Sequence, residues 1–281
     1  MELNMNRRRK KSKKGMFILV ILIILVVSGY FIYTQLIAKD KDTKQQVTSQ
    51  DTIEEEQAEV VEEEEIPQGP PYQEFFPIID GQQAYVVIPR IDEDNPPILI
   101  IYSHGSNTTV TQNMEDQFMK DMQGYGVFFT EHNYIFSASN QHGVNWGSSA
   151  SIQDTLNLKN WVDDNYDIEP QVYLIGFSMG GLPTMNFATT YPDLISKIAL
   201  LAPTVKSSEW NQERADKLDG IDIKLWHGNK DVNVPYSYSV YFVNKLKGYG
   251  KDIEFITLEG LTHFDLDTEY MNEILQFYES N

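Results

Sequence analysis

Residues 171–181 read Gln-Val-Tyr-Leu-Ile-Gly-Phe-Ser-Met-Gly-Gly, and this stretch decides the fold. An apolar run leads into a G-x-S-x-G pattern centred on Ser178, and a helix-compatible stretch, 182–190, follows. A sharp turn from a buried strand into a helix leaves no room for side chains beside the serine, so glycine is needed two residues before and after it. Such a turn raises the hydroxyl above the sheet edge and directs a helix N-terminus at it. The sequence therefore predicts Ser178 as a nucleophile.

A serine hydroxyl is a weak nucleophile at neutral pH, so it needs a base in contact with it and an acid that orients the base. In a doubly wound α/β sheet these partners lie on loops after later strands, in the order serine, acid, histidine. The run 223–228 predicts a short strand, and Asp231 lies on the loop after it. The run 253–258 predicts another strand, and His263 follows it. We therefore predict Asp231 and His263 as the partners of the serine.

Other residues of the same types have simpler interpretations. Asp265 is close to His263 in the sequence, but an acid at that place is typical of the start of the last helix. Two of the remaining histidines are interpreted as structural: His227 packs the Asp231 loop, and His104 orders the loop after the strand at 98–102. His132 and His142 are interpreted as plain loop residues.

The unbroken apolar run 98–102 is typical of a strand buried on both faces. It ends in a turn of small residues, Ser103-His104-Gly105-Ser106-Asn107. Backbone N–H groups in such a turn are suited to a developing negative oxygen, and the backbone N–H of Met179 would supply a second donor directly after the nucleophile.

Four segments together resemble the serine hydrolases of the α/β-hydrolase fold, in the order and spacing of that superfamily: His104-Gly105, 176–181, His227 to Pro235, and 260–264. The resemblance covers residues 75–281. It implies Ser178 as nucleophile, Asp231 as orienting acid and His263 as base. It also implies an oxyanion hole formed by the backbone amides of Ser106 and Met179, with no cofactor and no metal.

Strands that alternate with helices predict a mostly parallel sheet with helices on both faces. Asp80-Gly81 between two apolar runs predicts a hairpin of antiparallel first strands. A capping-box pattern at Ser151 indicates a helix start. Because only a short segment separates the strand at 198–201 from the next one, we expect a minimal cap. The helices are expected at 114–124, 151–166, 182–190, 238–246 and 268–278.

Two residues are candidates for the substrate pocket: Asn107, on the turn after the strand at 98–102, and Trp146, in a stretch (140–147) that is suited to line a pocket. The tyrosines at 236, 238 and 241 are more typical of a half-buried helix face than of a binding surface.

The sequence before the enzyme-like part has three zones. Residues 1–15 carry seven Lys and Arg against one acid, and residues 16–38 carry no charge. This apolar segment is long enough to span a bilayer core, and its positive flank orients the N-terminus toward the cytoplasm. It is too long for a signal-peptide core and no A-x-A-like site follows, so an uncleaved signal anchor is favoured over a cleaved peptide. We expect a single-pass protein of the cell membrane with its catalytic domain outside the cytoplasm.

Residues 39–71 hold 11 acidic residues, three lysines and no aromatic residue. Such a segment cannot bury a core and is expected to be an extended, self-repelling, disordered linker. Residues 72–281 then form one α/β-hydrolase domain, large enough to fold without disulfides, in a chain without cysteine.

The net charge of −19 hides an asymmetry, because the part after the apolar segment carries 15 basic and 40 acidic residues, a net charge of −25. Nucleic acid is therefore excluded as a partner. The scattered acids form no metal-ligand pattern, and no glycine loop suited to phosphate is present, so no metal or cofactor is expected.

The expected function is cleavage of a small-molecule or cell-envelope carboxylic ester through an acyl-enzyme. The same three residues serve peptidases, amidases and acyltransferases, and fold alone does not choose between them. A different class of function is a non-catalytic binding module on a tether, which would have no need for all three residues.

Overall fold

The computed structural model describes residues 71–266 and 268–280. The basic segment 1–15, the apolar segment 16–38 and, except for Pro71, the acidic linker lie outside these residues. Within the described ranges, every helix is too short or too polar to cross a membrane.

The enzyme-like part folds as an α/β domain in which strands and helices alternate. Its strands are β1 (Tyr72–Phe75), β2 (Ile78–Ile79), β3 (Gln82–Pro89), β4 (Ile98–Ser103), β5 (Tyr134–Ser139), β6 (Val172–Phe177), β7 (Ile195–Leu201), β8 (Asp222–Gly228) and β9 (Glu254–Leu258). Its α-helices are α2 (Gln117–Thr130), α3 (Ser149–Asn165), α4 (Gly181–Thr190), α5 (Gln212–Asp216), α6 (Tyr236–Gly248) and α7 (Met271–Glu279).

One sheet joins these strands in the order β1-β3-β5-β4-β6-β7-β8-β9, with β2 paired to β3. The pairs of β1 and β5 with β3 are antiparallel, and every pair from β5 to β9 is parallel. The predicted hairpin is present, because β2 and β3 pair across Asp80 and Gly81, both with positive φ. The mostly parallel sheet and the α/β-hydrolase fold are confirmed.

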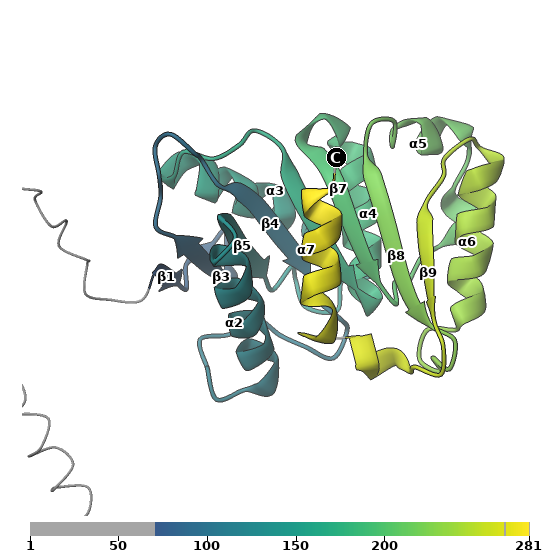
Figure 1. The fold of residues 1–281 in the computed structure, drawn as a ribbon, viewed down its shortest axis with the longest axis horizontal. Helices are drawn as coiled ribbons and strands as arrows, with labels where there is room; N and C mark the ends of the chain where they lie inside the picture. Colours follow the sequence, from purple (N-terminus) through teal and green to yellow (C-terminus); the bar gives the residue numbers. More distant parts are fainter. Residues whose placement is uncertain (1–70, 267, 281) are drawn as a thin grey trace, which may run out of the picture. The chain divides into compact units, whose positions relative to one another are not determined.

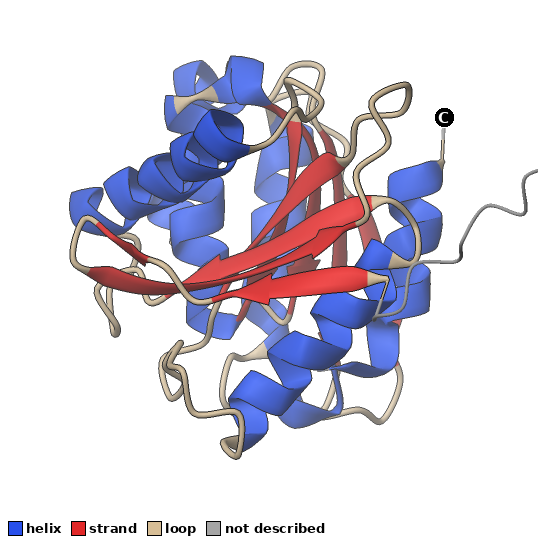
Figure 2. Cartoon of the chain, turned by 90° about the vertical axis from the view of Figure 1, so that its left-hand side faces the viewer, coloured by secondary structure: helices blue, strands red, loops and turns tan. Residues whose placement is uncertain are grey.

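Helices cover both faces of the sheet, as a buried parallel sheet requires. Side chains of α3, α4 and α6 form one core with one face, and those of α2 and α7 form a second core with the other. Figure 1 shows α2 and α7 in front of the strands, and Figure 2 shows the twisted strands between the helical layers.

Several predicted helix boundaries are wrong; the last helix, for example, begins at Met271, after a 3₁₀ turn at Thr268–Tyr270. The first helix begins at Gln117, where the Asp116 side chain caps the amide of Phe118, and it continues through Gly124 to Thr130. A side chain at Gly126 would overlap Val87 of β3, so glycine at this position lets the helix pack closely on the sheet. The N-cap of α3 is Ser148, not Ser151, which lies buried inside the helix.

The loops that follow β4, β5, β6, β8 and β9 leave the carboxyl edge of the sheet. In an open α/β sheet, ligands bind outside this edge. The connection between β7 and β8 holds only α5 and a short 3₁₀ turn, so the minimal cap expected from the sequence is present.

Candidate active site

Ser178 lies on the predicted sharp turn between β6 and α4. Its φ is 53°, a left-handed conformation that non-glycine residues seldom adopt and that signals local strain. A Cβ at Gly176 would lie 2.7 Å from the Thr184 hydroxyl, and a Cβ at Gly180 would lie 1.9 Å from the Ser103 carbonyl oxygen. Both glycines are therefore required because the backbone of the turn packs directly against β4 and α4.

The structure brings Ser178, His263 and Asp231 together in one chain of hydrogen bonds. The Ser178 hydroxyl lies 2.9 Å from Nε2 of His263, and Nδ1 of His263 lies 2.6 Å from Oδ2 of Asp231. The aspartate side chain is fully buried and the histidine ring is 4% exposed. An acid at Nδ1 holds the ring as the Nδ1–H tautomer, so that Nε2 is free to accept the serine proton.

The Asp231 carboxylate is held by its own loop. Its Oδ1 accepts hydrogen bonds from the backbone amides of Asn233, at 2.8 Å, and Val234, at 2.9 Å. These two contacts fix the carboxylate in place, since hydrogen bonds from backbone N–H groups to a carboxylate are stronger than those between neutral groups.

A second histidine also contacts the acid. Nε2 of His227 donates to Oδ2 of Asp231 (3.1 Å) and to the Val234 carbonyl (2.9 Å), while Nδ1 lies 2.8 Å from the Ser239 hydroxyl. Burial lowers the pKa of His227, opposed by its contacts with Val234 and Asp231. His227 therefore packs the acid loop in its neutral form.

This neutral histidine predicts a pH effect on stability. Below its ordinary pKa of 6.5 the unfolded chain takes up a proton that the folded chain does not, so stability falls as pH decreases below that value. The contribution of one such group is at most about 1.4 kcal/mol per pH unit. Urea unfolding at pH 7 and pH 5 should show a smaller acid loss in His227→Gln than in the wild type. An equal loss in both proteins would contradict the assignment.

The loop after β4 lies against the turn that carries Ser178. A Cβ at Gly105 would be 3.6 Å from the Ser178 Cβ, and Ser106 lines the same pocket as Ser178. The buried ring of His104 donates from Nε2 to the Asn140 carbonyl at 3.0 Å, which joins this loop to the one after β5. The oxyanion hole of Ser106 and Met179 stays a prediction, although both residues border Ser178.

A pocket of about 280 Å³ opens over Ser178 and His263. Both predicted pocket residues, Asn107 and Trp146, line it. Its other lining residues come from the carboxyl end of β6, from the first turn of α6 and from the segments after β4, β7, β8 and β9: Gly105, Ser106, Thr108, Phe177, Thr204, Asn233, Val234, Pro235, Tyr238 and Phe264. Among the described residues it is lined by no Lys, Arg, Asp or Glu side chain. A pocket of this size and polarity suits a small, uncharged group.

Sequence reasoning missed two features of the site. Tyr238 is 54% exposed and lines the pocket. The interpretation of the tyrosines as a half-buried face holds for Tyr236, whose hydroxyl forms a hydrogen bond with that of Thr257 and whose ring stacks on Phe255. His142 is no plain loop residue, because it pairs with the buried Asp154. The capping pattern drew attention to the helix start and gave no signal for this pair.

Comparisons with known proteins agree with the fold. A family model for phospholipases and carboxylesterases matches residues 80–281. The homoserine O-acetyltransferase of Thermobifida fusca (strain YX) is 29% identical over 134 residues, which are 46% of this chain and 34% of that protein. The chain thus spans about a third of the length of this relative.

Solved structures with the same fold include esterases and peptidases. A thermostable esterase matches with a TM-score of 0.56 and 16% identity, over 74% of this chain and 62% of that one. Est1E from Butyrivibrio proteoclasticus matches with a TM-score of 0.52 and 18% identity, over 73% of this chain and 95% of that one. The acylaminoacyl peptidase of Pyrococcus horikoshii matches with a TM-score of 0.56 and 14% identity, over 75% of this chain and 41% of that one. The family model covers most of the sequence and the sheet has the matching architecture, so the chain belongs to the phospholipase/carboxylesterase family of α/β hydrolases.

Proposed function

We propose that this protein is a serine hydrolase that cleaves uncharged carboxylic esters, with Ser178 as nucleophile, His263 as general base and Asp231 as the orienting acid. The observation that carries the proposal is the unbroken hydrogen-bond chain between these three side chains at the base of a pocket. Its placement on a strained strand-to-helix turn adds support, because strain of this kind is concentrated at functional sites.

In the first half of the reaction, Oγ of Ser178 attacks the ester carbonyl carbon while its proton passes to Nε2 of His263. The carbonyl π electrons move to oxygen, and the backbone amides of Ser106 and Met179 stabilise the resulting oxyanion. The tetrahedral intermediate collapses, the bond to the leaving oxygen breaks, and the imidazolium returns the proton to the departing alcohol. An acyl-enzyme on Ser178 remains.

In the second half, a water molecule gives a proton to His263 and attacks the acyl carbon. Collapse of the second tetrahedral intermediate breaks the bond to Oγ of Ser178 while the imidazolium of His263 returns its proton to that oxygen, and the carboxylic acid is released. Asp231 keeps its hydrogen bond to Nδ1 of His263 and stabilises the imidazolium in both halves.

Covalent labelling tests the proposal. A fluorophosphonate probe should label the wild-type chain and leave Ser178→Ala unlabelled. Absence of labelling in the wild type, together with no turnover of a broad ester panel, would reject the enzymatic function and favour a non-catalytic binding module.

The uncharged pocket predicts a preference among esters. The domain at 72–281 carries 29 acidic and 12 basic residues, and the pocket offers no counter-charge to an anionic substrate. We expect kcat/KM for p-nitrophenyl butyrate to exceed that for p-nitrophenyl hemisuccinate by at least about 30-fold, since an unpaired charge in a desolvated site costs several kcal/mol. Equal values, or a preference for the anion, would contradict this substrate class.

Acyl transfer is the second candidate, since the homoserine O-acetyltransferase relative carries that activity in its name. The two functions differ only in whether water or an alcohol takes the acyl group. Product analysis with a neutral ester in the presence of homoserine and of simple alcohols separates them, because a transferase forms a new ester faster than free acid.

We also propose that the apolar segment 16–38 anchors the chain in the cell membrane, with the hydrolase domain outside the cytoplasm. The absence of charge in this segment and the basic residues before it support this orientation. The full chain should remain in carbonate-washed membranes and be digested by protease added to intact cells. Release by carbonate, or protection from the protease, would refute the anchor or its orientation.

A further inference from the structure

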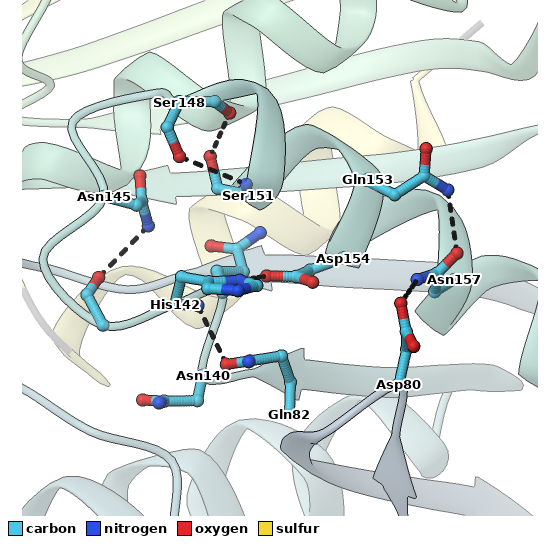
Figure 3. A network of polar contacts seen from close by, with 12 residues as sticks. Asp80, Gln82, Asn140, His142, Asn145, Ser148, Ser151, Gln153, Asp154 and Asn157 are labelled. Carbon is cyan, nitrogen blue, oxygen red and sulfur yellow. Dashed lines mark hydrogen bonds and ion pairs between the residues drawn. The ribbon is translucent and has the colours of Figure 1, made fainter.

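A separate histidine–aspartate pair lies outside the pocket, where the loop after β5 meets helix α3 (Figure 3). Nδ1 of His142 lies 2.5 Å from Oδ2 of Asp154. The Asp154 side chain is 4% exposed, whereas 52% of the His142 side chain is exposed. The amide of His142 also donates to the Gln82 side chain at 3.0 Å, so strand β3 supports the same residue.

Burial of the Asp154 carboxylate lowers the stability of the folded state. Burial raises the pKa of Asp154, and the contact with His142 opposes this shift while the nearby carboxylate of Asp80 adds to it. A charge that has lost its water weakens the folded state unless another group compensates it. An exposed polar residue on α3 would avoid this cost, so the pair is expected to serve something other than stability.

The loop that His142 belongs to has an unusual backbone. Three of its non-glycine residues are left-handed, with φ of 45° at Gln141, 59° at His142 and 46° at Trp146. Side chains make this conformation unfavourable, and it persists only where the surroundings enforce it. The loop therefore depends on external contacts to keep its shape.

Hydrogen bonds within the loop hold the backbone on both sides of His142 and of Trp146. The amide of Gly143 donates to the Asn140 carbonyl at 2.6 Å, and the Asn145 side chain donates to the Gly143 carbonyl at 3.2 Å. The same side chain accepts from the Gly147 amide at 2.9 Å. Trp146, between these last two residues, is 49% exposed and lines the pocket over Ser178.

We propose that the His142–Asp154 pair is a positioning device that fixes the 140–147 loop, so that the indole of Trp146 forms one wall of the pocket and determines how well larger acyl groups bind. The pair touches no reacting atom. The inference rests on the proposed function, because selectivity is read from ester cleavage.

The test compares the full chain with its His142→Asn variant on p-nitrophenyl acetate and p-nitrophenyl benzoate. Asparagine tolerates the left-handed backbone but is too short to reach Asp154, and the site is exposed enough for the variant to fold. The ratio of kcat/KM for benzoate to that for acetate should fall about tenfold, mainly through a higher KM for benzoate. Asp154→Ala removes the buried charge together with the contact and should shift the ratio in the same direction.

The decisive measurement is a double-mutant cycle with Trp146→Ala. If the pair acts through the indole, Trp146→Ala lowers the same ratio, and adding His142→Asn to it causes no further fall. The matched control is Asp163→Asn, which alters the Lys159–Asp163 ion pair on the same helix and should leave the ratio within twofold of the wild type.

Two results would overturn the inference. One is an equal loss on both esters in His142→Asn, which indicates a general structural role. The other is a loss that adds in full to that of Trp146→Ala. Fluorophosphonate labelling of each variant distinguishes these two results from failure of the proposed function. A variant that is labelled and keeps the wild-type selectivity refutes only the role of the His142–Asp154 pair.

Discussion

Replacing Ser178 with alanine is expected to lower kcat for ester hydrolysis by roughly 10⁵-fold, with little change in the free energy of unfolding. The hydroxyl oxygen lies 2.9 Å from Nε2 of His263. Alanine removes only this oxygen and keeps the backbone of the turn. Initial rates with p-nitrophenyl butyrate give kcat for both proteins, and urea unfolding gives their free energies of unfolding.

The loss is also expected to be non-additive with His263→Ala. Nucleophile and base act as one unit, so either substitution alone removes nearly all of the acceleration, and the double variant should be about as slow as each single one. Two independent losses that multiply would show that the hydrogen-bonded chain in the structure is not the reacting unit. A fall of less than tenfold in Ser178→Ala would show that another residue attacks the ester.

The second large effect is expected for Gly180→Ala. The added Cβ would lie 1.9 Å from the carbonyl oxygen of Ser103 and 2.5 Å from its carbon, and both belong to the backbone at the end of β4. Backbone in a central parallel strand has no room to yield, so the turn must move away from the strand. We expect a loss of at least about 3 kcal/mol in the free energy of unfolding, measured in urea, or failure to fold.

Gly124→Ala is the matched control. Gly124 lies inside helix α2, a Cβ there meets no atom within 4 Å, and its φ is not positive. Alanine is the better helix former, so this variant should be more stable by about 0.5–1 kcal/mol. If both glycine substitutions had similar effects, close backbone contact would not be the reason for glycine in the turn that carries Ser178.

The sequence was sufficient for the parts of the site that depend on local geometry and chain order. The pattern around Ser178 specifies a turn with a single steric solution, and the later strands place an acid and a histidine at the same sheet edge. Their convergence follows because the carboxyl ends of parallel strands share one edge. For the same reason the position of Asn107, after a neighbouring strand, could be anticipated.

The features that were missed depend on contacts across the fold. The pairing of His142 with Asp154 joins a loop to the second turn of a helix, and the left-handed backbone that brings them together has no marker in a histidine or a tryptophan. The exposure of Tyr238 depends on what the first turn of α6 packs against, whereas the sequence shows only that apolar residues recur there. Helix α2 ends later than predicted because it continues through Gly124, and because Gly126 lets it pack closely on Val87 of β3.

The short connection between β7 and β8 has a consequence for how catalysis begins. With only α5 and a 3₁₀ turn in this segment, none of its elements is large enough to fold over Ser178 and move aside before a reactant enters. Turnover therefore needs no preceding gating motion of this segment, and progress curves are expected to be linear from mixing, without a lag. Selection among acyl groups is then left to the walls of the pocket and not to this segment.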